Sequence, residues 1–122
     1  MTEFRVSVVI PVYNAGDFVG KAVHSALQQP EVEEVLLVED GSEDESLGVC
    51  RGLAQSHGRV KLHRHPDGAN HGAGASRNLG IRRSICPYVA FLDADDYYLD
   101  GRFERDERIL TTGSSVDGVY SA

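Results

Sequence analysis

The hydrophobic positions fall into short apolar runs separated by longer amphipathic stretches. Residues 5–12, 35–38 and 88–92 are almost continuously apolar and rich in β-branched or aromatic side chains, which is typical of strands buried on both faces. Residues 60–63 alternate more weakly, and residues 116–120 form a last short run. The pattern therefore predicts five strands in all.

Between these strands, apolar residues recur at helical spacing. Pro30 is expected to end the first helix, and Ser42 with Glu45 forms a capping box that starts the second. Gly58 is the expected C-cap of the second helix. Several glycines lower the helix propensity of the third, a local conflict of the kind that occurs at functional positions. The predicted helices span residues 17–29, 42–58, 75–83 and 103–110.

Strands and helices thus alternate along the whole chain. This order predicts an α/β fold, an open and mostly parallel twisted sheet with helices on both faces. The length of 122 residues fits a single domain, 1–122. Pro11 cannot donate a ladder hydrogen bond, so strand pairing is expected to stop there. Ligands of such sheets bind outside the carboxyl ends of the strands.

The run at 88–92 ends abruptly in three carboxylates, Asp93, Asp95 and Asp96. Like charges this close repel one another, so the cluster favours folding only if something positive neutralises it. A hard divalent cation such as Mg²⁺ or Mn²⁺ takes oxygen ligands and completes its coordination with water and phosphate oxygens. The alternative is a solvated acidic loop in which Asp95 or Asp96 caps the next helix.

Polar residues also follow the first two buried strands. Tyr13 and Asn14 end the first, and Glu39 and Asp40 end the second. Because the carboxyl ends of parallel strands meet at one edge of the sheet, we expect these residues to converge with the acidic residues that begin at Asp93. Such convergence favours a binding site over an ordinary acidic loop.

Charge and composition exclude several classes of function. The net charge of −7 argues against non-specific binding to nucleic acid. No stretch approaches the roughly 18 apolar residues of a membrane span, and the N-terminus lacks the pattern of a signal peptide. Cys50 and Cys86 have no CxxC spacing, so we expect free thiols in a reducing cytosol. His63, His65 and His71 are closely spaced, and surface positions are favoured over a transition-metal site.

Four motifs, in order, carry a family resemblance. They read VSVVIPVYN at 6–14, VEDGS at 38–42, N-x-G-x-x-x-S-R-N-x-G at 70–80 and FLDADD at 91–96. Together they resemble the nucleotide-sugar half of family 2 glycosyltransferases, which have the GT-A fold. The resemblance covers most of the chain, and its specificity comes from the four motifs jointly.

The resemblance implies a nucleotide pocket that starts at the end of the first strand. Asp40 would accept the ring N–H of the base, usually uracil, and Glu39 stands where the family commonly has a second aspartate. Arg77 would lie near the base and the diphosphate, where it could also pair with Asp40. The implied nucleotide-binding residues are Pro11, Val12, Tyr13, Asn14, Glu39, Asp40, Arg77, Asp93 and Ala94.

For the acidic motif at 91–96, the resemblance implies a different role for each aspartate. Asp93 would contact the ribose or a metal-bound water. Asp95 would ligate the Mn²⁺ or Mg²⁺ that bridges the diphosphate, so Asp93 and Asp95 form the expected metal site. Asp96 would brace the loop.

The implied activity is transfer of a sugar, with inversion, from a nucleoside-diphosphate donor to an acceptor hydroxyl. A UDP-sugar is the favoured donor, and a glycan or a lipid-linked molecule is the expected acceptor. The catalytic base lies further along the chain than Ala122 in this family, which continues for roughly another hundred residues. We therefore expect the donor half of a longer protein, held at the inner face of the membrane through other parts, or an unusually short relative. An uncovered sheet surface would favour self-association of this half.

Other functions remain as alternatives. The strongest is a module that binds a nucleotide or nucleotide sugar without transferring anything. A phosphoryl-receiver domain would need an acidic pair after the first strand and a lysine after the fifth, and the sequence has neither. An aspartyl phosphatase would carry its Asp-x-Asp at the first strand, and a nucleotidylyltransferase would carry a glycine-rich basic loop there. The sequence matches none of these three enzymatic or signalling patterns.

Overall fold

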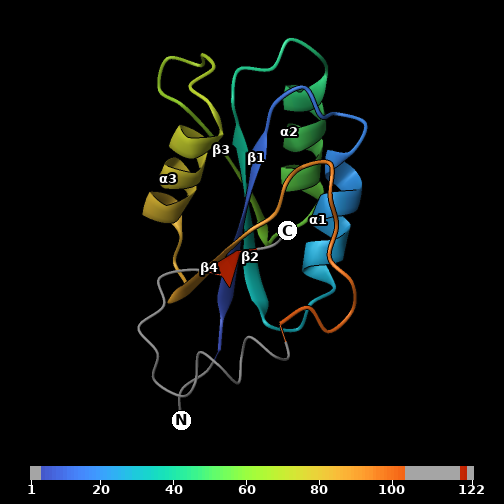
Figure 1. Cartoon of the computed structure of the whole chain (residues 1–122). Helices are drawn as coiled ribbons and strands as arrows, with labels where there is room; N and C mark the ends of the chain where they lie inside the picture. Colours follow the sequence, from blue (N-terminus) through green and yellow to red (C-terminus); the bar gives the residue numbers. More distant parts are fainter. Residues whose placement is uncertain (1–3, 104–118, 121–122) are drawn as a thin grey trace.

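The fold is an open parallel sheet flanked by helices (Figure 1). The structure is a computed structural model, and it describes residues 4–103 and 119–120. In chain order the elements are β1 (Val6–Val12), α1 (Val19–Leu27), β2 (Val32–Glu39), α2 (Ser46–Ser56), β3 (Val60–Arg64), α3 (Ala73–Arg83), β4 (Tyr88–Phe91) and β5 (Val119–Tyr120).

The strand order is β3-β2-β1-β4-β5, and every pair is parallel. The chain winds outward from β1 to β3 and then crosses back to β4 on the other side of β1. In Figure 1 α3 covers one face of the sheet, and α1 and α2 cover the other. The predicted α/β class and alternation of elements are confirmed for the described residues.

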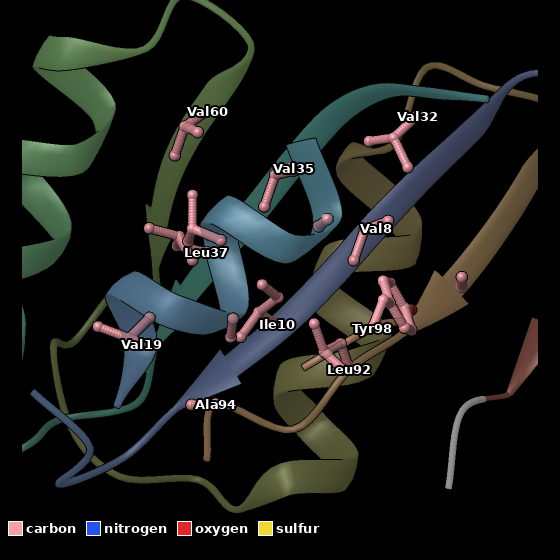
Figure 2. Close-up of a cluster of buried hydrophobic side chains, with 14 of the residues drawn as sticks. Val8, Ile10, Val19, Val32, Val35, Leu37, Val60, Leu92, Ala94 and Tyr98 are labelled. Carbon is pink, nitrogen blue, oxygen red and sulfur yellow. The ribbon is translucent and has the colours of Figure 1, made fainter. Parts of the chain in front are cut away.

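Two apolar cores lie on the two faces of the sheet because side chains alternate along a strand. Val8 and Ile10 of β1 belong to the larger core under α1 and α2 (Figure 2). Val9 belongs to a smaller core with Leu36 and Leu79, the latter from α3. Each fully buried side chain of this kind contributes about 1.5–3 kcal/mol. The buried strands are thus held from both sides, as their continuous apolar sequence predicts.

Pro11 affects the two neighbours of β1 differently. Pairing with β4 ends at Val9 opposite Phe91, whereas pairing with β2 continues to Val12, whose carbonyl accepts the N–H of Asp40 at 2.8 Å. Alternate residues of a strand direct their backbone groups to the same neighbour, so Pro11 faces β4 as Val9 does. The prediction that pairing stops at Pro11 holds toward β4 and is wrong toward β2.

The start of α2 also differs from prediction. The helix begins at Ser46 instead of Ser42, so the predicted capping box is wrong. The hydroxyl of Ser42 accepts the N–H of Asn14 at 2.9 Å, and the carboxylate of Asp44 accepts the N–H of Ser46 at 2.8 Å. A contact with a distant loop has replaced the local cap. The other helix boundaries differ from prediction by a few residues, as helix ends commonly do.

A buried carboxylate of β2 lies on the same face of the sheet as the smaller core. Glu34 is 1% exposed and accepts hydrogen bonds from Ser7 Oγ (2.7 Å), Ile85 N (2.8 Å) and Lys61 Nζ (3.1 Å). Burial by itself raises the pKa of Glu34, but these hydrogen bonds outweigh it and the pKa ends below its ordinary value. The carboxylate therefore stays ionised and ties the segment before β4 to the sheet.

One glycine of α3 has a packing role. A Cβ on Gly80 would lie 2.3 Å from Val9 Cγ1, whereas a Cβ on Gly74 would meet nothing within 4 Å. The helix therefore lies against β1 at a distance that only glycine allows at position 80. This explains part of the conflict between glycine content and helix formation.

The remaining predictions for this region can be compared briefly. Both cysteines are free thiols as predicted; Cys50 is buried in the larger core, where burial raises its pKa to about 12, whereas Cys86 is only half-buried. Within residues 4–103 no helix is long and apolar enough to cross a bilayer. Phe103, the start of the predicted fourth helix, lies in a turn, and 104–110 are outside the described residues. The predicted last strand is seen at Val119–Tyr120, and 116–118 are also outside them.

Candidate functional site: a cleft at the carboxyl ends of the strands

A cavity of about 490 Å³ opens at the carboxyl edge of the sheet. The loops after β1, β2, β3 and β4, together with the start of α3, form its wall, as expected for a parallel sheet whose winding direction reverses beside β1. The lining residues are Pro11, Val12, Tyr13, Asn14, Ala15, Phe18, Asp40, Asn70, Gly72, Ala73, Asp93, Ala94 and Asp95.

The β1–α1 loop (residues 13–18) and the β2–α2 loop (residues 40–45) bind one another reciprocally. Asn14 donates its N–H to Ser42 Oγ at 2.9 Å, and its side-chain oxygen accepts the N–H of Glu43 at 2.8 Å. Asn14 has a φ of +50°, in the left-handed region that asparagine tolerates better than most residues. The side chain and the backbone conformation of Asn14 thus both fasten the end of β1 to the end of β2.

Two further contacts continue this connection toward the helices. Ala15 donates its N–H to Ser46 Oγ at 2.9 Å, and Gly16 donates to Asp44 Oδ2 at 3.4 Å. Hydrogen bonds from Ser46 above all, and also from Gly16, hold the pKa of Asp44 below its ordinary value. The first turns of α1 and α2 are therefore linked through polar groups beside the cleft.

Asp40 binds the β3–α3 loop (residues 65–72) to the end of β2. Its side chain is about 3% exposed. Oδ1 accepts the N–H of His71 at 2.7 Å and lies 3.3 Å from His65 Nε2; Oδ2 accepts the N–H of Gly72 at 3.0 Å and Asn70 Nδ2 at 3.1 Å. Three of the roughly four lone-pair sites of this carboxylate therefore accept hydrogen bonds from the β3–α3 loop, and His65 lies beside it.

Glu39 turns away from the cleft. Its two carboxylate oxygens accept the N–H groups of Gly41 (3.1 Å) and Ser42 (2.7 Å), and Arg64 Nε lies 3.7 Å from Oε1. The side chain is 1% exposed and is not part of the cavity lining. The structure gives Glu39 a role in holding the turn that follows β2.

Gly41 allows the second and third loops to come together. It has a φ of +71°, and a Cβ there would lie 2.6 Å from the backbone nitrogen of Asn70 and 2.7 Å from the backbone carbon of Ala69. Glycine is required on both counts, because L residues rarely adopt this φ and a side chain would strike the facing backbone. The β1–α1, β2–α2 and β3–α3 loops therefore form one interconnected wall.

The acidic loop (residues 93–97) is held from beneath. Leu92, Ala94 and Tyr98 are buried in the larger core, whereas the intervening Asp93 and Asp95 are exposed on the cleft wall (Figure 2 labels the buried three). Residues 93–96 form a turn, in which the N–H of Asp96 donates to the carbonyl of Asp93 at 3.0 Å. Apolar anchors thus present two carboxylates to the cavity without hydrogen bonds from other loops to those carboxylates, as far as the described residues show.

Arg77 lies beside the acidic loop. Its Nη2 is 3.8 Å from Asp93 Oδ1, with the two side chains 41% and 63% exposed. The expected pairing of Arg77 with Asp40 is not seen, and His65 approaches Asp40 instead. The preceding residue, Ser76, is the one that faces inward on this turn of α3, which directs Arg77 outward toward β4. Arg77 is thus at the rim, outside the lining.

The two carboxylates at the cleft suit a divalent cation in part. Asp93 and Asp95 offer hard oxygen donors in one loop, but the described residues contain no group of three or more His, Cys, Asp or Glu side chains arranged to hold a metal. Mg²⁺ and Mn²⁺ commonly bind one or two carboxylates and take water and phosphate oxygens for the rest. The donor set therefore fits such an ion only together with an anionic ligand. Asp96 instead accepts the N–H of Tyr97 at 2.8 Å and braces the loop, as predicted.

The histidines do not form a metal site. His65 Nε2 faces Ser76 and Asp40, and His71 Nε2 lies 2.8 Å from Asp67 Oδ1. Desolvation and the nearby positive charge of Arg83 lower the pKa of His63. His65 is buried, so the prediction of surface positions for all three was wrong for His65.

Most predicted site residues come together in the cleft. Among those predicted, Glu39 and Arg77 are outside the lining. Asn70 and Gly72 were part of a recognised motif but had no assigned role, and only the fold shows that they reach Asp40. Phe18 was not predicted as a site residue, because an aromatic side chain at the start of a helix is usually part of the apolar face of that helix. The eight predicted residues found in the lining are Pro11, Val12, Tyr13, Asn14, Asp40, Asp93, Ala94 and Asp95.

Two curated proteins with similar sequences are named as a polysaccharide biosynthesis protein and as a glycosyltransferase. Succinoglycan biosynthesis protein ExoU of Rhizobium meliloti is 40% identical over 97 residues, which is 80% of this chain and 28% of the relative. Glycosyltransferase GlyG of Streptococcus pneumoniae is 34% identical over 101 residues, 81% of this chain and 33% of the relative. The chain thus spans about a third of the length of these relatives.

Solved structures share the fold. TarS 1–349 of S. aureus in complex with UDP has a TM-score of 0.71 and 25% identity, covering 88% of this chain and 32% of that one. Mannosyltransferase PcManGT from Pyrobaculum calidifontis, in complex with GDP-Man and Mn²⁺, has a TM-score of 0.74 and 21% identity, covering 91% and 33%.

A protein-family model gives the assignment. The model described as Glycosyl transferase family 2 matches residues 7–106, most of the chain. The sheet and its flanking helices have the fold of the GT-A type transferases found among the structural neighbours. The chain belongs to glycosyl transferase family 2, as its four motifs predict.

Proposed function

We propose that this chain forms the donor-binding half of a glycosyltransferase that uses a nucleoside-diphosphate sugar, with a UDP-sugar favoured. The sugar would pass, with inversion, to a hydroxyl of a glycan or lipid-linked acceptor. The observation that carries the proposal is the cavity of about 490 Å³ at which Asn14, Asp40, Asp93 and Asp95 meet. Family membership and the nucleotide complexes of the structural neighbours support it.

The two ends of the cavity suit the two ends of such a donor. The interconnected loops around Asp40 and Asn70 present polar groups that suit a nucleobase. Because Asp40 already accepts from three donors and lies beside His65, a base N–H would have to compete with these partners for the carboxylate. The exposed carboxylates of Asp93 and Asp95, with Arg77 beside them, suit the ribose and diphosphate end.

Asp95, with Asp93, would hold Mn²⁺ or Mg²⁺ together with the diphosphate. A bound divalent cation would neutralise the charge that grows on the departing nucleoside diphosphate. Arg77, at 3.8 Å from Asp93, places a second positive charge at the same end of the cavity. The fold depends on neither the cation nor the Arg77 guanidinium, because the acidic loop is anchored by its buried apolar residues.

Inversion requires the acceptor hydroxyl to attack from the face of the sugar opposite the leaving diphosphate, assisted by a carboxylate base. We assign no base to this chain, and we propose that a later part of the complete protein supplies it together with the acceptor pocket. We also propose a cytoplasmic location, which suits a neutral Cys50 thiol and a nucleotide-sugar donor.

Titration calorimetry of the chain with UDP, with Mn²⁺ and then with EDTA, tests the proposal. Saturable binding of UDP that strengthens with Mn²⁺ is expected, and GDP and ADP serve as controls for the base. No binding under either condition would contradict a donor site. Equal affinity for all three nucleotides would contradict a base-reading role for the loops around Asp40.

The second candidate is a nucleotide-sugar binding module without transfer. It is supported by the polar groups of the cavity lining, which suit binding of a nucleotide and do not by themselves require transfer. Turnover assays on the complete protein with UDP-sugars separate the two candidates, because only the enzyme releases UDP in an acceptor-dependent way.

A further inference from the structure

His65 is a buried titratable side chain that the proposed function does not use. It follows β3 directly and is 8% exposed. Its Nε2 lies 3.0 Å from Ser76 Oγ and 3.3 Å from Asp40 Oδ1. One ring nitrogen thus reaches the end of β2 and the fully buried inner side of α3 from the end of β3.

The geometry fixes which ring nitrogen carries a proton. A bare Nε2 would direct its lone pair at the Asp40 carboxylate, which is an acceptor only when ionised. Nε2 must therefore carry the hydrogen, which Ser76 Oγ accepts at 3.0 Å while Asp40 Oδ1 lies beside it at 3.3 Å. The choice of tautomer follows from the neighbours, as is usual for a buried histidine.

The surroundings of His65 keep water away from this contact. The ring of His71 packs on the ring of His65 with 4.5 Å between centroids, and Asp67 holds His71 through Nε2 at 2.8 Å. A polar contact with an ionised group is stronger when it is shielded from water. Residues 65–71 therefore contact the Asp40 carboxylate from a side that is covered by other side chains.

The support matters for the cleft because of what Asp40 holds. The backbone amides of His71 and Gly72 both donate to Asp40, and Gly72 lies on the cavity wall at the start of α3. These donors all come from the β3–α3 loop, whereas His65 connects the same carboxylate to Ser76 inside α3. His65 thus links the loop and the carboxylate to the body of the helix.

We propose that His65 is a positioning residue for the nucleobase side of the cleft. The positive end of its Nε2–H bond faces the Asp40 carboxylate at 3.3 Å and, through that carboxylate, steadies the amides of His71 and Gly72 that form the wall. This inference rests on the proposed function only for its effect on nucleotide affinity. Its structural part concerns the chain without ligand and is tested separately.

The first test compares three variants by UDP titration. His65→Gln keeps an N–H donor near the position of Nε2, His65→Leu fills the space without a donor, and His57→Leu is the matched control. His57 also contacts another histidine ring, that of His24, but lies outside the cavity lining. We expect about tenfold weaker binding for His65→Leu and no more than about threefold for the other two, consistent with loss of one close polar contact to a charged group.

The second test needs no nucleotide. In the free chain, ¹⁵N signals of the His65 ring should show a hydrogen on Nε2, and amide exchange at His71 and Gly72 should be about tenfold faster in His65→Leu. A bare Nε2, or unchanged exchange at both amides, would overturn the proposal. Equal loss of UDP affinity in His65→Gln and His65→Leu would overturn the donor role.

A failure of the proposed function is distinguishable from a failure of this inference. If the unsubstituted chain binds no UDP, the donor site is wrong, while the ring signals and amide exchange still decide on His65. If His65→Leu does not fold, the smaller His65→Ala takes its place, because it also removes the Nε2 hydrogen beside Asp40. Faster exchange at His71 and Gly72 in His65→Ala supports the proposal, and unchanged exchange overturns it.

Discussion

On one side of the cleft, three loops hold one another by hydrogen bonds centred on Asn14 and Asp40, whereas on the other side the acidic loop stands on buried apolar side chains. The first side is assembled before any ligand arrives. The second presents the carboxylates of Asp93 and Asp95 with Arg77 at 3.8 Å from Asp93. The two sides are thus built on different kinds of interaction.

The difference suggests two kinds of recognition in one cavity. A preorganised polar wall loses little entropy on binding and suits a neutral, flat group with fixed donors and acceptors. A pair of exposed carboxylates repels a diphosphate until a cation neutralises them. We therefore expect substitutions on the first side to change stability and substitutions on the second to change metal-dependent affinity.

The largest effect is expected for Asp95→Asn. The substitution keeps the size of the side chain but removes a charged metal ligand, so UDP affinity in Mn²⁺ should fall about 100-fold or more. The free energy of unfolding should stay the same or rise, because one member of a repelling cluster is neutralised. Calorimetry and urea denaturation measure the two quantities. Asp100→Asn, which changes an exposed aspartate outside the lining, is the control. Unchanged affinity in Asp95→Asn would refute the metal assignment.

Gly41→Ala tests the interconnected wall. Its Cβ would meet the backbone of Asn70 and Ala69, and φ is +71°, so we expect a loss of about 2–4 kcal/mol in the free energy of unfolding. Gly72→Ala is a matched control with φ of +93° and nothing within 4 Å of a Cβ, and should lose about 1–2 kcal/mol. Urea denaturation of both variants gives the comparison. Equal losses would mean that loop contact adds nothing to backbone strain.

Asn14→Ala should lower the free energy of unfolding by about 1–2 kcal/mol, because the N–H of Glu43 loses its acceptor and φ of +50° becomes less favourable. Asn14→Gly keeps the backbone freedom and removes only the side chain. The difference between the two variants in thermal denaturation separates the hydrogen bond from the conformational term. A neutral Asn14→Gly would show that the side-chain contact is dispensable.

The smallest effect is expected from lowering the pH until Asp44 is protonated. The pKa of Asp44 is below its ordinary value of 3.8, because Ser46 and Gly16 hydrogen-bond the ionised form. Its stabilising contribution is therefore complete above pH about 3.8 and is lost as pH falls through the lower folded value. The amide shifts of Gly16 and Ser46, followed by NMR against pH, should move together with a midpoint below 3.8. Asp44→Asn should abolish that transition, and a midpoint at or above 3.8 would contradict the link.

The strands and the acidic loop could be predicted because their signals are local. A run of apolar residues that ends in aspartates specifies both a buried strand and an exposed turn, and β4 with Asp93 and Asp95 follows that pattern. The same local logic failed at Ser42. A serine three residues before a glutamate can cap a helix, but its hydroxyl is taken by Asn14 from a different loop. Nothing in the neighbouring sequence indicates that competition.

The partners of charged residues were likewise beyond sequence reasoning. Arg77 and Asp40 belong to motifs that place them near one ligand, but which side of α3 faces the sheet decides their partners. Ser76 faces inward and Arg77 faces the acidic loop, so His65 reaches Asp40. Such a choice depends on the rotation of one helix, which periodicity alone does not define in a segment this rich in small residues.

The strand order has one more consequence. Because the chain returns from β3 to the far side of β1 before it forms β4, the cavity is bordered both by the loop after the first strand and by the loop after the fourth. An occupant would act as a non-covalent cross-link between early and late parts of the chain. Ligand binding should therefore raise the free energy of unfolding of the whole sheet, by about 2.7 kcal/mol at a ligand concentration of 100 times Kd.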